Sequence, residues 1–344
     1  MAIKPKISIN KRPPLDAKIL FKGIQDGKRE ALSKALTLVE STKLEHRKIA
    51  KELVQLATPH SGSSIRIGIT GVPGVGKSTF IESFGLFAIQ KQKKVCVLAI
   101  DPSSEISKGS LLGDKTRMEQ LSVHSDAYIR PSPTSGTLGG VARATRESIL
   151  LCEAFGFDYL LIETVGVGQS ETKVHSMTDI FLMLLLSNAG DEIQGIKRGI
   201  MEMADILVVN KADGENKRNA KIAANQLQQA LHYFPLAKSG WTPAVETMSA
   251  LNQEKIDVIW SKIQQFIDHT KQNNYFENNR KSQAVNWFKQ SLTDQLVERI
   301  EKDSRFTEEL RKLELSVESG NTDPFIAADK MIDFYFKYSS EAPA

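Results

Sequence analysis

The chain has 344 residues, of which 41% are hydrophobic and 25% are charged, and its formal net charge is +4. These proportions are typical of a globular protein with a large core. The longest apolar run, residues 180–186, is too short to span a bilayer, so we expect no membrane association. Residues 1–64 hold 13 Lys or Arg against 6 Asp or Glu but only one aromatic, Phe21, which argues against nucleic-acid binding.

The order of periodic segments predicts a helical region, then an α/β region, then helices again. Apolar residues at helical spacing predict amphipathic helices over residues 14–56, and residues 58–64 form a linker. Short β-type runs then alternate with helical stretches, which is typical of a mostly parallel sheet with helices on both faces. These runs are residues 65–69, 95–100, 128–129, 159–163, 180–186, 206–210 and 244–248. Beyond residue 251 the pattern is helical, with a break near residues 318–324.

These segments suggest three domains: an N-terminal helical extension (1–64), a nucleotide-binding domain (65–265) and a C-terminal helical arm (266–344). Cys96 lies in a strand-like run and Cys152 in a helix-like one, with no metal-type spacing, so we expect both to be buried core thiols. The N-terminus has no apolar signal-peptide core, and we expect a cytoplasmic protein, or a mitochondrial matrix protein in a eukaryote.

A phosphate-binding loop stands between the first strand-like run and a helical one. Residues 71–78 match the pattern G-x-x-x-x-G-K-[ST], in which backbone N–H groups surround phosphate oxygens. Lys77 then adds charge at the β- and γ-phosphates, and the Ser78 hydroxyl faces Mg²⁺. The expected contacts of this P-loop are Gly71, Val72, Pro73, Gly74, Val75, Gly76, Lys77, Ser78 and Thr79.

Two later loops predict that the base is guanine. Asn210, Lys211 and Asp213 follow the strand-like run 206–209, at the ligand edge of such a sheet. A carboxylate at the position of Asp213 can accept from the N1–H and the 2-amino group of guanine, whereas adenine offers no such donors. Ser249, Ala250 and Leu251 fit a second loop, from which a backbone N–H would meet O6 of the base.

Three acidic residues are candidates for Mg²⁺ and water. Asp101 and Glu163 each end a strand-like run, and Asp114 lies in the sequence Gly-Asp-Lys-Thr-Arg. Because Mg²⁺ keeps several waters, carboxylates beside a P-loop can hold those waters. Helix capping by Asp101 or Asp114 is the alternative. We assign catalytic roles to Lys77 and to these three acids.

Two Gly-rich polar segments look like switches whose order depends on the γ-phosphate. The first contains Gly166 and Gln169, and a role for Gln169 in orienting the attacking water stays open. The second segment spans residues 188–199, and its candidate residues are Gly190, Asp191, Glu192, Gln194 and Lys197. A rigid loop is the alternative for both segments.

Together these motifs resemble the MeaB/ArgK/MMAA family of SIMIBI-class P-loop GTPases. The resemblance covers nearly the whole chain, and the segments that carry it are residues 31–41, 68–81, 112–118, 163–171, 190–205 and 210–214. It implies a slow GTPase that uses GTP, GDP and Mg²⁺ and forms a homodimer through its C-terminal arm. It also implies a partner, an adenosylcobalamin-dependent acyl-CoA mutase such as methylmalonyl-CoA mutase, whose cofactor loading is gated by GTP. The segment that contains Lys197 resembles the family's extra switch, which senses the partner.

Other functions remain open from the residues alone. A GTPase metallochaperone would share the fold but usually carries His-rich or Cys-motif ligands, which this sequence lacks. A P-loop kinase would use the same phosphate cradle but has no use for Asn210 and Asp213. A non-catalytic scaffold with structural GTP is a third alternative.

Overall fold

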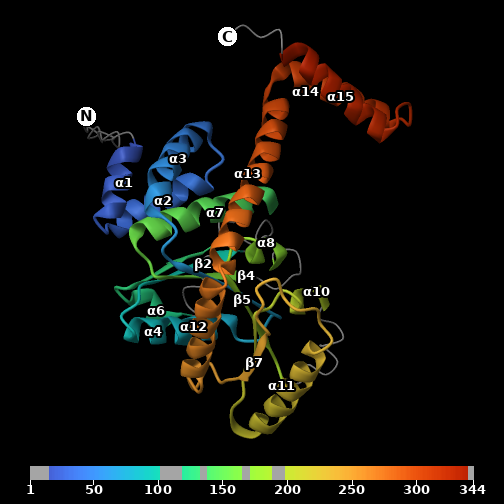
Figure 1. Cartoon of the computed structure of the whole chain (residues 1–344). Helices are drawn as coiled ribbons and strands as arrows, with labels where there is room; N and C mark the ends of the chain where they lie inside the picture. The colour runs from blue at the N-terminus through green and yellow to red at the C-terminus, as the bar shows by residue number, and fades with distance from the viewer. Residues whose placement is uncertain (1–14, 101–117, 132–137, 165–170, 188–197, 340–344) are drawn as a thin grey trace, which may run out of the picture. The chain divides into compact units, whose positions relative to one another are not determined.

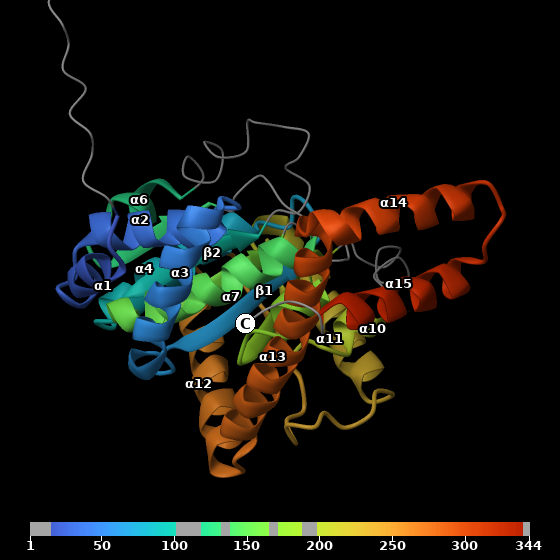
Figure 2. The ribbon, with the colours of Figure 1, turned by 90° about the horizontal axis from the view of Figure 1, so that it is seen from above.

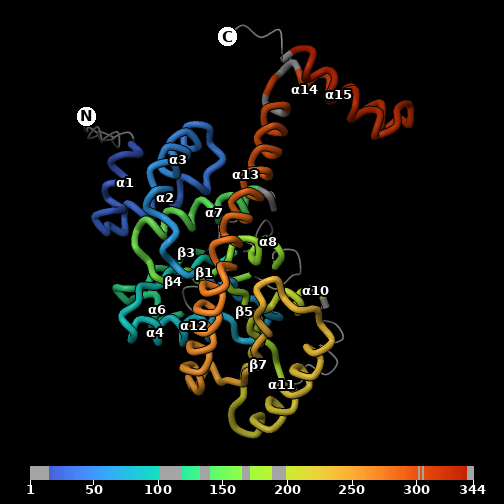
Figure 3. Tube along the Cα trace, in the orientation of Figure 1, coloured from blue at the N-terminus to red at the C-terminus, as the bar shows by residue number. Residues whose placement is uncertain are grey.

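The computed structural model describes residues 15–100, 118–131, 138–164, 171–187 and 198–339 (Figure 3). The chain divides into two compact units, Met1–Arg280 and Lys281–Ala344. The first unit contains a sheet with helices on both faces, and the described part of the second consists of helices and short turns between them.

The sheet of the first unit has seven strands in the described residues, and all neighbouring strands are parallel. Their order is β3-β2-β4-β1-β5-β6-β7, which puts β1 in the middle. The strands are β1 (Ile65–Gly71), β2 (Val95–Ile100), β3 (Ala127–Arg130), β4 (Tyr159–Thr164), β5 (Ile180–Leu185), β6 (Ile206–Val209) and β7 (Ala244–Thr247). The predicted α/β class with a parallel sheet is therefore confirmed, and the predicted strand ends differ from these by at most two residues.

Helices lie on both faces of the sheet (Figure 1). Alternate residues of the strands contribute to the cores on these two faces. In β4, Tyr159 and Leu161 join the core under α4 (Lys77–Gln90), α6 (Glu119–Val123) and α12 (Ile256–Gln272). The opposite face is covered by α7 (Leu138–Phe155), α8 (Glu171–His175), α10 (Arg198–Met201) and α11 (Lys217–Leu231). Because both faces are covered, the strands β4 and β5 are buried at every position.

Three N-terminal helices pack against α7, and Figure 2 shows these helices on the same side of the sheet as α7. They are α1 (Ala17–Gln25), α2 (Arg29–Glu40) and α3 (Leu44–Ala57), followed by a short 3₁₀ turn, η1 (Thr58–His60). Arg29 of α2 donates to the backbone carbonyls of His124, Ser125 and Ala127 beside β3, and Arg130 of β3 pairs with Glu40. These contacts attach the predicted helical extension to the edge of the sheet.

The amino edge of the sheet is fixed by one repeated contact. An aspartate directly before a strand accepts a hydrogen bond from the backbone at the start of the neighbouring strand, at 2.8 Å in each case. The pairs are Asp158 with Lys94 N–H, Asp179 with Arg66 N–H and Asp205 with Phe181 N–H. Because each bond satisfies one backbone group at one position only, it holds the register of that strand pair.

The structure also confirms two further predictions, one about the cysteines and one about the C-terminal helices. Cys96 and Cys152 are buried free thiols whose sulfurs lie 3.5 Å apart. The C-terminal helices are α13 (Tyr275–Lys302), α14 (Ser304–Glu318) and α15 (Pro324–Ser339), with a break where the sequence places it. No helix in the described ranges combines the length and apolar character that a bilayer crossing needs.

Candidate nucleotide site

The P-loop follows β1, the central strand, and leads directly into α4. Gly71 comes too close to its neighbour for any side chain, because a Cβ there would lie 2.6 Å from the carbonyl oxygen of Leu184 on β5. Gly76 has φ 97°, in the left-handed region that favours glycine, and a Cβ would lie 2.7 Å from the Asn210 Nδ2 atom. Two of the pattern's glycines are thus required by the fold itself.

Helix α4 begins at Lys77, and its N-cap residue Gly76 has no side chain to cap the first turn. The N–H groups of that turn and the positive end of the helix dipole therefore face the loop, an arrangement that suits phosphate. The Lys77 Nζ atom donates to the carbonyl oxygens of Gly71 at 2.8 Å and Val72 at 3.3 Å. The ammonium group thus lies within the loop, and Ser78 is half-buried beside it in the sequence.

Asn210 joins the P-loop to both predicted base loops. Its Nδ2 atom donates to the carbonyl oxygen of Val75 at 2.8 Å, and its Oδ1 atom accepts from the N–H of Ala250 at 3.0 Å. Asn210 is 1% exposed, so both bonds are shielded from water. The structure gives this residue a positioning role across three loops, which the sequence pattern alone did not indicate.

Asp213 is held by the second base loop. The Ser249 hydroxyl donates to an Asp213 carboxylate oxygen at 2.5 Å, and the same hydroxyl accepts from the N–H of Asn252 at 3.2 Å. Between Asn210 and Asp213, Lys211 has φ 58° and is exposed, and Ala212 N–H bonds to the carbonyl of Met248. The two loops are therefore tied together by side chains and by backbone.

Glu163 is the penultimate residue of β4, and its backbone pairs with Ile69 of β1 on one side and Ala99 of β2 on the other. Its side chain is 9% exposed. The next residue, Thr164, donates from its hydroxyl to that of Thr70, which directly precedes the P-loop, at 2.9 Å. This buried pair links the end of β4 to the P-loop, and nothing in the sequence patterns singled it out.

Several predicted residues lie outside the described part of the chain. They are the acids Asp101 and Asp114, and the switch residues Gly166, Gln169, Gly190, Asp191, Glu192, Gln194 and Lys197. Of the predicted Mg²⁺ contacts, Ser78 and Glu163 are described, and both offer oxygen atoms, the ligand type that Mg²⁺ prefers. The oxygen atoms of Ser78 and Glu163 are therefore suitable ligands for Mg²⁺.

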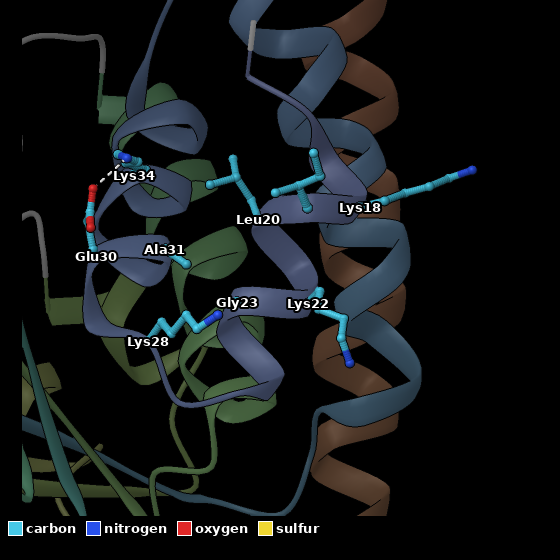
Figure 4. A pocket seen from close by; sticks show the side chains of 9 residues that line it. Lys18, Leu20, Lys22, Gly23, Lys28, Glu30, Ala31 and Lys34 are labelled. Carbon is cyan, nitrogen blue, oxygen red and sulfur yellow. Dashed lines mark hydrogen bonds and ion pairs between the residues drawn. The ribbon is translucent and has the colours of Figure 1, made fainter. Parts of the chain in front are cut away.

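A pocket of about 510 Å³ lies elsewhere, between α1 and α2 (Figure 4). Its lining includes Leu20, Gly23 and Ala31 and contains no residue of the three loops. The side chains of Lys18 and Lys22 point away from it, and Lys34 pairs with Glu30 at 2.6 Å. It is therefore separate from the nucleotide site.

The comparison with protein families decides the identity of the chain. The profile of the family described as "Methylmalonyl Co-A mutase-associated GTPase MeaB" matches residues 32–305. The chain belongs to the MeaB family. It is accordingly a GTPase that binds guanine nucleotide, as the P-loop and the base loops predict.

Relatives of the MeaB-family chain cover most of its length. It is 46% identical to a probable GTPase of Mycobacterium tuberculosis over 91% of this chain and 94% of that protein. It is 40% identical to the GTPase ArgK of Escherichia coli, over 90% and 94%. It is 42% identical to the mouse "Methylmalonic aciduria type A homolog, mitochondrial", over 91% and 78%.

The fold of this MeaB-family chain also matches a solved structure. The crystal structure of a protein named LAO/AO transport system kinase aligns with a TM-score of 0.71 and 34% sequence identity. The alignment covers 92% of this chain and 97% of the other. The shared fold therefore extends over the helical segments as well as the sheet.

Proposed function

We propose that this GTPase is a chaperone of an adenosylcobalamin-dependent acyl-CoA mutase, and that its nucleotide state gates cofactor loading and protection of that enzyme. The observation that carries the proposal is the assembly of the P-loop and two base loops around Asn210, within a chain of the mutase-associated family. The name of the mouse relative, which refers to methylmalonic aciduria, points to methylmalonyl-CoA mutase as the partner.

The candidate site residues have separate tasks in this mechanism. The P-loop N–H groups and Lys77 bind the phosphates, while Asp213, oriented by Ser249, accepts from the N1–H and 2-amino groups of guanine. Ser78 and Glu163, with Asp101 and Asp114, would hold Mg²⁺ and its waters. Bound Mg²⁺ neutralises charge on the β- and γ-phosphates.

The switch segments connect hydrolysis to the partner. In the sequence, residues 166–169 follow β4 and residues 190–197 follow β5, and these two described strands end at the carboxyl edge where the P-loop lies. Contacts to a γ-phosphate would order such segments, and hydrolysis would release them. Lys197 is our candidate for contact with the mutase.

We also propose a homodimer built through the C-terminal arm. On α13 the apolar side chains of Val285, Phe288, Leu292 and Leu296 are 40–66% exposed. They recur every three or four residues, which puts them along one side of the helix. A second copy of the chain would cover this stripe.

The proposal is tested with purified chain and purified methylmalonyl-CoA mutase from the same organism. Alone, the chain should hydrolyse GTP at roughly 10⁻⁴ to 10⁻² s⁻¹, as unassisted G proteins do. We expect the mutase to raise this rate at least tenfold and to be retained by the chain with a non-hydrolysable GTP analogue. A rate and a retention that do not depend on the mutase would contradict the chaperone role.

A further inference from the structure

Ser83 connects the phosphate-binding helix to the loop that faces the base. It lies on α4, six residues after Lys77, and its side chain is buried, with 6% of the residue exposed. Its hydroxyl donates to the carbonyl oxygen of Ala250 at 2.6 Å, although the two residues are 167 positions apart in sequence. No motif includes Ser83, so only the structure shows this contact.

The contact fixes the direction of one peptide group. In a trans peptide the C=O and the following N–H point in opposite directions. Because the Ala250 carbonyl points toward Ser83 on α4, the N–H of Leu251 points away from that helix. This N–H has no hydrogen-bond partner within the described residues, and the Leu251 side chain is 78% exposed.

The loop around this peptide has little freedom to turn. Ser249 N–H bonds to the carbonyl of Glu254 at 3.3 Å, and Glu254 N–H bonds to the carbonyl of Ser249 at 3.0 Å. The Ala250 N–H is held by Asn210, so the peptide before Ala250 is also fixed. The hydrogen bond from Ser83 thus fixes the orientation of the remaining peptide group, which joins Ala250 and Leu251.

We propose that Ser83 is a positioning residue for guanine recognition, which aims the Leu251 N–H at O6 of the base. The inference rests on the proposed nucleotide site and adds to it a residue outside the base loops. It assigns the loop after β7 to the 6-oxo group, whereas Asp213 recognises the N1–H and the 2-amino group. Because Ser83 is on α4, which follows the P-loop, its hydrogen bond also fixes the position of the loop of residues 249–251 relative to that helix.

The test measures dissociation constants of GDP, 6-thio-GDP, IDP and ADP for the wild type, Ser83→Ala and Ser83→Cys. Cysteine keeps the shape of serine with a larger sulfur atom in place of the oxygen, and its thiol is a weak donor. Loss of one buried hydrogen bond corresponds to roughly tenfold weaker GDP binding. The preference for GDP over 6-thio-GDP, which differ only at position 6, should fall at least threefold in both variants. The preference for GDP over IDP, which differ at the 2-amino group, should not change.

Thr270→Val is the matched control, because it also removes a buried hydroxyl that donates to a carbonyl, that of Phe266 on its own helix. It should leave all four constants unchanged. Equal weakening of GDP, 6-thio-GDP and IDP, or unchanged GDP binding in Ser83→Cys, would overturn the role of Ser83. If the wild type does not prefer GDP to ADP, the proposed guanine site is wrong. This outcome differs from failure of the Ser83 proposal, in which the wild type still prefers GDP.

Discussion

At the scale of single residues, the site depends on side chains that hold loops as much as on those that would contact nucleotide. Asn210 bonds to Val75 of the P-loop and to Ala250 of the second base loop. Ser249 orients Asp213 in the same way. Buried polar groups of this kind are costly when one partner is removed, because the other is left without a hydrogen bond.

We therefore expect Asn210→Ala to weaken GDP binding by about 10²-fold, since two buried backbone groups lose their partner at roughly 1–3 kcal/mol each. Asn252→Ala, an exposed position in the neighbouring loop, is the control and should bind GDP as the wild type does. Isothermal titration calorimetry measures both. Equal affinities for the two variants would argue against the joining role of Asn210.

Lys77→Ala should abolish GTP turnover and weaken GTP binding, because it removes the charge at the phosphates. Lys91→Ala, at the C-cap of the same helix, tests whether loss of a lysine at the other end of α4 also has this effect. Single-turnover hydrolysis, measured with enzyme in excess, is the readout. An unchanged hydrolysis rate in Lys77→Ala would contradict the role of the P-loop in GTP hydrolysis.

At the scale of elements, Asp205 at the amino edge of the sheet makes the stability of the fold depend on pH. Burial raises the pKa of Asp205 from 3.8 to about 7, and the hydrogen bond from Phe181 N–H lowers it only in part. The folded state therefore binds this proton more tightly than the unfolded state. Between about pH 4 and 7, Asp205 lowers the free energy of unfolding as pH rises, by at most about 1.4 kcal/mol per pH unit.

Asp205→Asn should remove this dependence, because the amide oxygen can still accept from Phe181 N–H without carrying a charge. Urea unfolding of both proteins at pH 5, 6, 7 and 8 gives the difference in unfolding free energy. We expect the variant to gain stability relative to the wild type up to about pH 7, with no further gain above it. A difference that is constant over this range would contradict the raised pKa.

The secondary-structure elements were easier to predict than the side-chain contacts between them. The sequence patterns predicted all seven strands of the described sheet, and most clearly those that are buried on both faces, such as β5 and β6, because their apolar runs are continuous. The P-loop and the base loops were visible because their chemistry requires particular residues at fixed spacing. Contacts such as Ser83 with Ala250 and Thr70 with Thr164 were not, because a serine or threonine in a helix or strand has no pattern that names a partner far away in sequence.

At the scale of the whole molecule, the exposed stripe on α13 is an apolar surface that the described residues of a single copy of the chain do not cover. Apolar side chains on one side of a long helix are typical of helix-to-helix contact. The first unit holds the nucleotide loops, so loss of the dimer should leave nucleotide binding largely intact.

Leu292→Glu should convert the proposed dimer to a monomer, because it places a charge in the centre of the stripe. Asp294→Arg, at an exposed polar position on the opposite side of the same helix, should leave the dimer unchanged. Light scattering after size-exclusion chromatography measures the mass, and GDP affinity measured in parallel reports on the first unit. A monomeric wild type would remove the proposed arm contact.

The central claim is that the P-loop and the two loops joined by Asn210 form a guanine-specific site. The most direct measurement is the affinity of the wild type and of Asp213→Asn for GTP, ATP and xanthosine triphosphate. Xanthine carries an oxygen where guanine has its 2-amino group, so an amide at position 213 suits it better than a carboxylate. We predict that the wild type prefers GTP and that Asp213→Asn prefers xanthosine triphosphate. The same order of affinities in both proteins would contradict the claim.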